Sequence, residues 1–164
     1  MRFRKYDNSS ALMEDGDLTR MLGRPFSSAH IRVAARKEGQ MGNCFEAAAM
    51  MMTDLGLFGL DKCGIDRKDW QKRAVLAHGI ITGQGPIEGQ PHPHAWVEYQ
   101  GVAFDLSNNR AVVLPAAFYL AMARPVMEPV RYAHTDALKQ LFTSGHFGPW
   151  DKALNDAANK AEGD

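Results

Sequence analysis

One stretch of the chain is apolar enough on all sides to predict a buried helix. Residues 44–55 contain only three polar side chains, and a helix that is apolar nearly all round is usually enclosed by protein. Asn43 just before the stretch is a good N-cap residue, and Gly56 just after it is a good stop signal. The pattern therefore predicts a short buried helix that begins at Cys44.

Two further stretches alternate in the period of β-strands. Residues 94–99 and 102–106 are joined by Gln100-Gly101, which predicts a hairpin with a two-residue loop. Side chains alternate between the faces of a strand, and directly opposed residues share a face. One face would then be wholly apolar, with Ala95, Val97, Tyr99, Val102, Phe104 and Leu106. The opposite face would carry His94, Trp96, Glu98, Ala103, Asp105 and Ser107. A register slip of one residue would exchange the two faces.

The rest of the pattern predicts further elements around these two. We expect a strand over 74–82 interrupted by Gly79, an exposed Gly- and Pro-rich loop over 83–91, a helix over 115–123, a strand over 125–132, a helix over 135–143 and a surface helix beyond Trp150. An irregular crossover is expected over 57–72, with one helical turn over 66–73. The expected organisation is a polar segment of short helices and loops over 1–39, which is a candidate to cover a cleft, one domain over 40–150, and a tail over 151–164.

Composition restricts the class of protein. The 164 residues suffice for one ordinary domain, and the apolar fraction of 45% with 23% charged residues is that of a globular protein. The formal net charge is zero, which disfavours nucleic acid or an anionic membrane as the main partner. No apolar run is long enough to span a bilayer, and the basic first residues are not followed by the apolar run of a secretory signal. Two cysteines without an export signal predict a reducing, cytoplasmic location.

Cys44, His94 and Asp105 are the candidate catalytic residues. A thiolate is the reactive form of cysteine, and a helix N-terminus stabilises an anion by only about 0.3–1 kcal/mol. Because one pKa unit corresponds to about 1.36 kcal/mol, a histidinium partner is needed, and we assign that role to His94. Asp105 would orient the imidazole. The oxyanion would be held by the Cys44 backbone N–H and by a side-chain donor, for which Gln40 is preferred over Asn43 because Asn43 is needed as the cap.

A cysteine at a helix start, then the sequence His94-Ala95-Trp96-Val97-Glu98, then Phe104-Asp105 resembles the transglutaminase-like branch of the papain-like cysteine hydrolases. The layout is also similar to that of the leader peptidases of lasso-peptide pathways. The resemblance covers residues 40–108. It implies an α+β fold in which a central helix bearing the nucleophile packs on an antiparallel sheet, and acyl chemistry on peptide or glutamine amides without a cofactor.

The leading hypothesis is a thiol-dependent hydrolase that cleaves an amide or peptide bond of a peptide or protein through an acyl-enzyme. A glutamine deamidase or transglutaminase would use the same thioester, and a non-catalytic binding module would keep the fold alone.

Trp96 is expected to be a lid over the imidazole or the wall of a groove, and Asn108 is an alternative third group to Asp105. A zinc or iron site at Cys44, His92, His94 and Asp105 is a rival reading. It is disfavoured because flanking prolines predict that His92 lies in the loop. The oligomeric state stays open.

Overall fold

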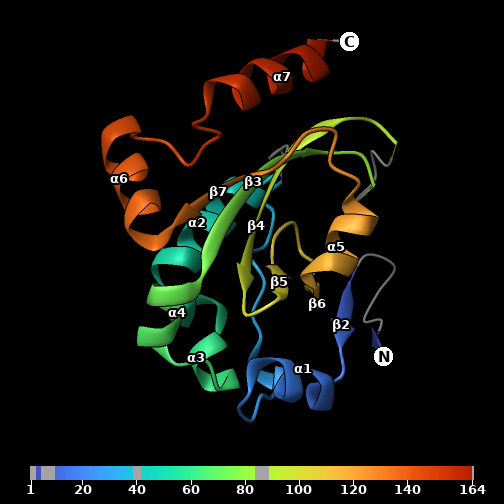
Figure 1. Cartoon of the computed structure of the whole chain (residues 1–164), viewed down its shortest axis with the longest axis vertical. Helices are drawn as coiled ribbons and strands as arrows, with labels where there is room; N and C mark the ends of the chain where they lie inside the picture. Colours follow the sequence, from blue (N-terminus) through green and yellow to red (C-terminus); the bar gives the residue numbers. More distant parts are fainter. Residues whose placement is uncertain (1–2, 5–9, 39–41, 84–88, 164) are drawn as a thin grey trace.

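A mixed β-sheet lies at the centre of an α+β fold (Figure 1). The computed structural model of the protein describes residues 3–4, 10–38, 42–83 and 89–163. The strand order is β1-β2-β6-β5-β4-β3-β7, and among these neighbours β2 and β6 are parallel while the other pairs are antiparallel. The strands are β1 (Phe3–Arg4), β2 (Ala11–Met13), β3 (Val75–Ile81), β4 (His92–Tyr99), β5 (Val102–Asp105), β6 (Val112–Pro115) and β7 (Val130–Ala133).

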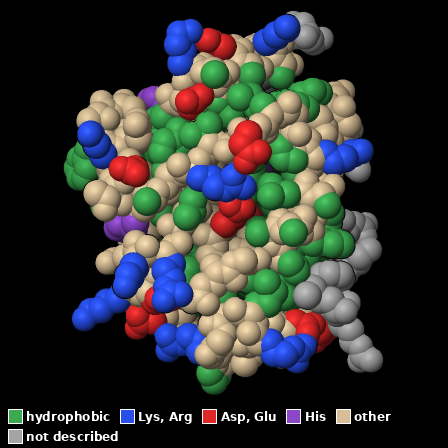
Figure 2. All heavy atoms as spheres, viewed as in Figure 1, with side chains coloured by type: hydrophobic (Ala, Val, Ile, Leu, Met, Phe, Trp, Pro, Cys, Tyr) green, Lys and Arg blue, Asp and Glu red, His purple; other side chains and the backbone are tan. Residues whose placement is uncertain are grey.

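Helices cover the sheet on both faces. They are α1 (Asp15–Leu22), α2 (Cys44–Thr53), α3 (Leu60–Cys63), α4 (Arg67–Arg73), α5 (Ala116–Ala123), α6 (His134–Ser144) and α7 (Lys152–Gly163), with 3-10 turns η1 (Ser28–His30) and η2 (Leu55–Phe58). No helix within the described residues is long and apolar enough to cross a membrane. On the face seen in Figure 2, acidic and basic side chains are interspersed, in keeping with the zero formal net charge.

The hairpin has the register that the sequence predicts. Val97 lies opposite Phe104, and Tyr99 lies opposite Val102. The apolar face of the hairpin packs into the main core together with Ala47 and Met51 of α2. The opposite face is also buried, because α5 packs over it and Trp96 and Tyr119 belong to a second, smaller core. The polar side chains of that face therefore lie inside the protein rather than at its surface.

The end of α2 and the start of β4 differ from the prediction. Helix α2 ends at Thr53, because the Asp54 side chain accepts a hydrogen bond from the Gly56 N–H and starts η2 there. His92 was expected in a loop but lies in β4, opposite Ile81. Proline is tolerated on both sides of His92 because β4 pairs with β5 only from Val97 onwards, so the start of β4 is an edge on that side.

The N-terminal part of the chain contributes to the sheet and the core. Strand β2 pairs with β6, and Leu12 and Leu18 are buried in the main core. Neither β2, of three residues, nor β6, of four residues, was predicted from the sequence. Residues 11–22 are therefore a structural part of the domain.

Candidate active site

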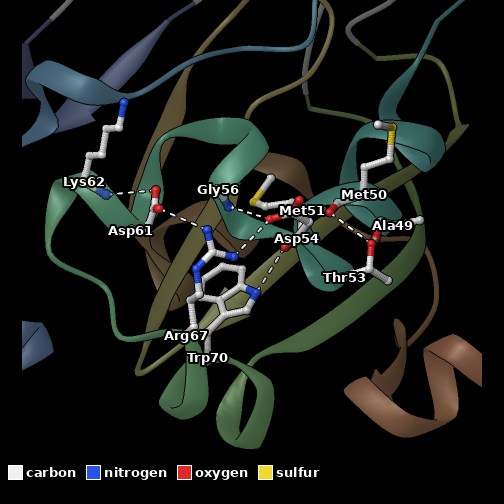
Figure 3. A network of polar contacts seen from close by, with 10 residues as sticks. All are labelled: Ala49, Met50, Met51, Thr53, Asp54, Gly56, Asp61, Lys62, Arg67 and Trp70. Carbon is white, nitrogen blue, oxygen red and sulfur yellow. Dashed lines mark hydrogen bonds and ion pairs between the residues drawn. The ribbon is translucent and has the colours of Figure 1, made fainter.

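Helix α2 presents Cys44 from its first turn, and its other end is firmly anchored. Figure 3 shows the contacts at that end: the Trp70 indole N–H donates to the Met51 carbonyl oxygen over 3.1 Å, and the Arg67 guanidinium reaches both Asp54 and Asp61. The Arg67–Asp54 and Arg67–Asp61 distances are 3.2 and 3.1 Å. The position of the thiol is therefore set by a helix held at its far end to α3 and α4.

His94 and Asp105 form a buried pair on the face of the sheet that α5 covers. The Nε2 atom of His94 lies 2.7 Å from Oδ2 of Asp105, and the side chains are only 4% and 1% exposed. The separation follows from the register, since diagonal neighbours across two strands are within reach of long side chains. With Nε2 engaged by the acid, Nδ1 is the ring nitrogen left for the thiol.

His94 and Asp105 each shift the pKa of the other, and these shifts set the charge state of the pair. Burial alone would lower the pKa of His94, but the charges of the Asp105 carboxylate and a Cys44 thiolate, together with their hydrogen bonds, raise it well above the usual value. Burial alone would raise the pKa of Asp105, and the charge and hydrogen bond of His94 outweigh this and lower it. At neutral pH the pair is therefore an imidazolium and a carboxylate. Cys44 is half-buried and close enough to act on the ring.

Three further residues surround Asp105, and sequence reasoning assigned a role to none of them. The Ser107 hydroxyl donates to Oδ1 over 2.7 Å, and the Tyr119 hydroxyl donates to Oδ2 over 2.9 Å. The Arg110 guanidinium lies 3.8 Å from Oδ2. Ser107 was detectable, because it follows Asp105 on the same face. Tyr119 was not, because only the packing of α5 on the sheet brings it there.

Asn43 has a different role from the two that the sequence suggested. It makes no side-chain cap hydrogen bond to α2. Its Nδ2 donates to the carbonyl oxygens of Ala34 and Ala35 at 3.2 Å each, and its Oδ1 accepts from the Asn108 N–H at 2.7 Å. Both amide protons are thus used, and neither points to an oxyanion. Asn108 is correspondingly committed to Asn43, through its own Oδ1 and the Asn43 N–H, rather than to His94.

We expect Asn43→Ala to lower the free energy of unfolding by about 1–3 kcal/mol, because a 6% exposed residue loses three side-chain hydrogen bonds and leaves buried partners unpaired. Urea unfolding followed by circular dichroism measures this change. The exposed Asn155→Ala in α7 is the control, with an expected change within about 0.5 kcal/mol. Equal midpoints for the two variants would contradict the assigned role of Asn43.

The sequence also suggested Gln40 and Trp96 as supporting residues of the site. Gln40 lies outside the described residues. Trp96 is fully buried and stacks beside the His94 ring, with centroids 6.1 Å apart and an interplanar angle of 24°. It therefore supports the imidazole from the side and does not line an open groove. Glu98, which shares this face of the hairpin, pairs with Arg131 over 2.7 Å.

Neither a metal-binding cluster among the described residues nor the hollow between α5 and β7 includes the three residues. Within the described parts of the chain, no group of three or more His, Cys, Asp or Glu side chains is placed to hold a metal ion. A hollow of about 380 Å³ lies between α5 and β7. Its lining is Leu120, Pro125, Val126, Met127, Glu128, Pro129 and Arg131. Because it contains none of Cys44, His94 and Asp105, we do not place the reacting group of a substrate there.

Compared with models of known families, with curated proteins and with solved structures, the chain matches none.

Proposed function

We propose that the protein is a thiol-dependent hydrolase with a papain-like or transglutaminase-like arrangement, which cleaves an amide or peptide bond through an acyl-enzyme. The observation that supports this most is the buried His94–Asp105 pair with Cys44 acting on the same ring. Helix α2 begins at the cysteine and packs in the main core with the strands that bear the histidine and the acid, so all three groups are carried by elements in contact with one another.

In the proposed reaction His94 first holds the thiol proton on Nδ1, which leaves Cys44 as a thiolate. The sulfur attacks the carbonyl carbon, and the C–N bond breaks as His94 gives that proton to the leaving amine. Water then attacks the thioester and gives one proton to His94, and the carboxylic acid leaves as the thiolate re-forms. Asp105 keeps the ring oriented throughout and stabilises its positive charge.

Alkylation of Cys44 by iodoacetamide as a function of pH tests the proposal. We expect the rate to rise well below about pH 8.5, where a free thiol ionises. We expect His94→Ala to slow the reaction at about pH 6 by about tenfold or more, because the imidazolium that stabilises the thiolate is gone. Cys63 contributes little background, since it is buried and burial raises its pKa to about 11.

The matched control is His92→Ala, which removes the other histidine from the same strand face and leaves the His94–Asp105 contact in place. Its profile is expected to follow that of the unaltered protein. Identical profiles for the unaltered protein and His94→Ala would overturn the proposal and favour a binding module. A fluorogenic peptide library, with Cys44→Ala as the inactive reference, then identifies the amide that is cleaved.

A further inference from the structure

The Oδ2 atom of Asp105 is shared between two donors. It accepts from His94 Nε2 at 2.7 Å and from the Tyr119 hydroxyl at 2.9 Å. The other oxygen, Oδ1, accepts from Ser107. A triad needs the acid to bind the histidine, but it does not need a phenol on the same oxygen. The second donor therefore calls for a physical explanation of its own.

The phenol is held rigidly in place. Tyr119 is fully buried in α5, and its ring packs against Trp96 with centroids 5.3 Å apart. Trp96 in turn stacks on the His94 ring. The C-terminal end of α5 is fixed against the end of β3, where Gly83 passes so near the Met122 carbonyl oxygen that a side chain would be 1.7 Å away. The Tyr119 hydroxyl is thus held against Oδ2 by helix α5, whereas His94 reaches the same oxygen from β4.

We propose that Tyr119 is a positioning residue that moderates the pull of Asp105 on the His94 proton, by donating its hydroxyl hydrogen to the carboxylate oxygen that His94 binds. A hydrogen bond to a carboxylate stabilises its charge and makes it a weaker acceptor for any other donor. With the phenol present, Asp105 still stabilises the imidazolium enough for it to form. The ring nevertheless remains acidic enough to release its Nδ1 proton. The consequence for catalysis rests on the proposed function, in which His94 must pass its proton to the leaving amine.

The other groups around the pair do not duplicate this effect. Arg110 lies farther from Oδ2, at 3.8 Å. His92, two residues before His94 on β4, is half-buried, and burial together with the charges of His94 and Arg110 lowers its pKa, so it is neutral at pH 7. Cys44, at the start of α2, interacts with the His94 ring rather than with Asp105 Oδ2. Tyr119 and Ser107 are therefore the neutral donors that tune Asp105.

The test is Tyr119→Phe in the full chain, with the protonation of the His94 ring followed by nitrogen-15 NMR. We expect the pH at which His94 loses its charge to rise by about one unit, a tenfold change in the ratio of the two forms, because the unshared Oδ2 binds the imidazolium more strongly. The rise in Cys44 alkylation is expected to move to lower pH. Turnover of a cleaved peptide is expected to fall with little change in KM, since the proton is released less readily.

If Tyr119 only held the site together, Tyr119→Phe would shift the His94 titration and the Cys44 alkylation profile in the opposite directions. Loosening of the site would weaken the His94–Asp105 contact, so that His94 would lose its charge at lower pH and alkylation would rise at higher pH. Either of those results, or an unchanged His94 titration, overturns the inference. Ser107→Ala, which removes the donor to Oδ1, is a second variant and is expected to shift His94 in the same direction as Tyr119→Phe.

The control is Tyr132→Phe, which removes a half-buried phenol next to His78 rather than next to the pair. It is expected to leave the His94 titration unchanged. The NMR measurement does not depend on thiol reactivity. An ordinary alkylation profile in the unaltered protein would therefore refute the proposed function, while an unshifted His94 in Tyr119→Phe would refute only the role of the phenol.

Discussion

Acidification from pH 7 to pH 4 is expected to remove about 3 kcal/mol of the free energy of unfolding through a single residue, His78. His78 lies on β3, outside the candidate active site, and is completely buried. Neither of its ring nitrogens has a hydrogen-bond partner among the described residues. Burial lowers its pKa to about 3.

The surroundings of His78 explain why a charge there is so unfavourable. Three aromatic rings surround the imidazole, those of Phe45, Tyr132 and Trp150, with centroids 4.8, 5.2 and 4.9 Å away. Gly148 passes so close that a side chain at that position would lie 2.6 Å from the ring. Among the described residues, the pocket thus offers no acceptor for a second ring proton. It also packs Trp150 and Gly148 of the C-terminal segment against Phe45 in the first turn of α2.

The direction of the effect follows from linkage. In the unfolded chain His78 takes up a proton near pH 6.5, whereas in the folded protein it does so only near pH 3. The unfolded state therefore binds more protons between these values, and stability falls as the pH falls through this range. His94 acts with the opposite sign, because its raised pKa gives stability below pH 6.5 that is lost at high pH.

Urea unfolding at pH 7 and pH 4 measures the total change, and His78→Leu isolates the part due to this residue. The leucine variant has no group to protonate in that pocket, so we expect its stability to be about 3 kcal/mol less dependent on pH over this interval. The expectation fails if His78→Leu and the unaltered protein lose the same free energy. The reference variant for this comparison is His92→Ala, which removes a half-buried histidine from β4 and leaves His78 in place.

Leu18→Ala is expected to lower the free energy of unfolding by about 2–5 kcal/mol, because it leaves a cavity in the main core. Leu18 is a fully buried residue of α1, within the segment 1–39 that the sequence suggested as a polar cover for the cleft. If the segment were only a cover, the substitution would change access to Cys44 and leave stability almost unaltered. Urea unfolding and the Cys44 alkylation rate distinguish the two cases.

Leu57→Ala is the control for this prediction, because Leu57 in η2 is 50% exposed and leaves no cavity when shortened. It is expected to change stability far less than Leu18→Ala does. Comparable losses in the two variants, or a large gain in alkylation with unchanged stability in Leu18→Ala, would contradict the assignment of α1 to the core. For the same reason, removal of residues 1–39 is expected to unfold the domain rather than to activate it.

Local pattern was sufficient for the elements that carry the strongest periodicity. The apolar run after Asn43 predicted a helix that begins at Cys44, and the structure confirms that start. The alternation on either side of Gln100-Gly101 predicted the β4–β5 register, which is also confirmed. Both features depend on neighbours within a few residues, so the sequence contains all the information that they need.

Contacts between distant parts of the chain decided the rest. The packing of α5 buried the polar face of the hairpin and brought Tyr119 to Asp105, although 14 positions separate the two residues. The side chain of Asn43 bonds to Ala34, Ala35 and Asn108 instead of capping the helix that it precedes, and Asn108 is 65 positions away in the sequence. The sequence by itself thus determined which residues bear the candidate chemistry and how His94 and Asp105 are paired. Only the tertiary structure determined how deeply the pair is buried and which donors tune it, since burial depends on elements that pack from elsewhere in the chain.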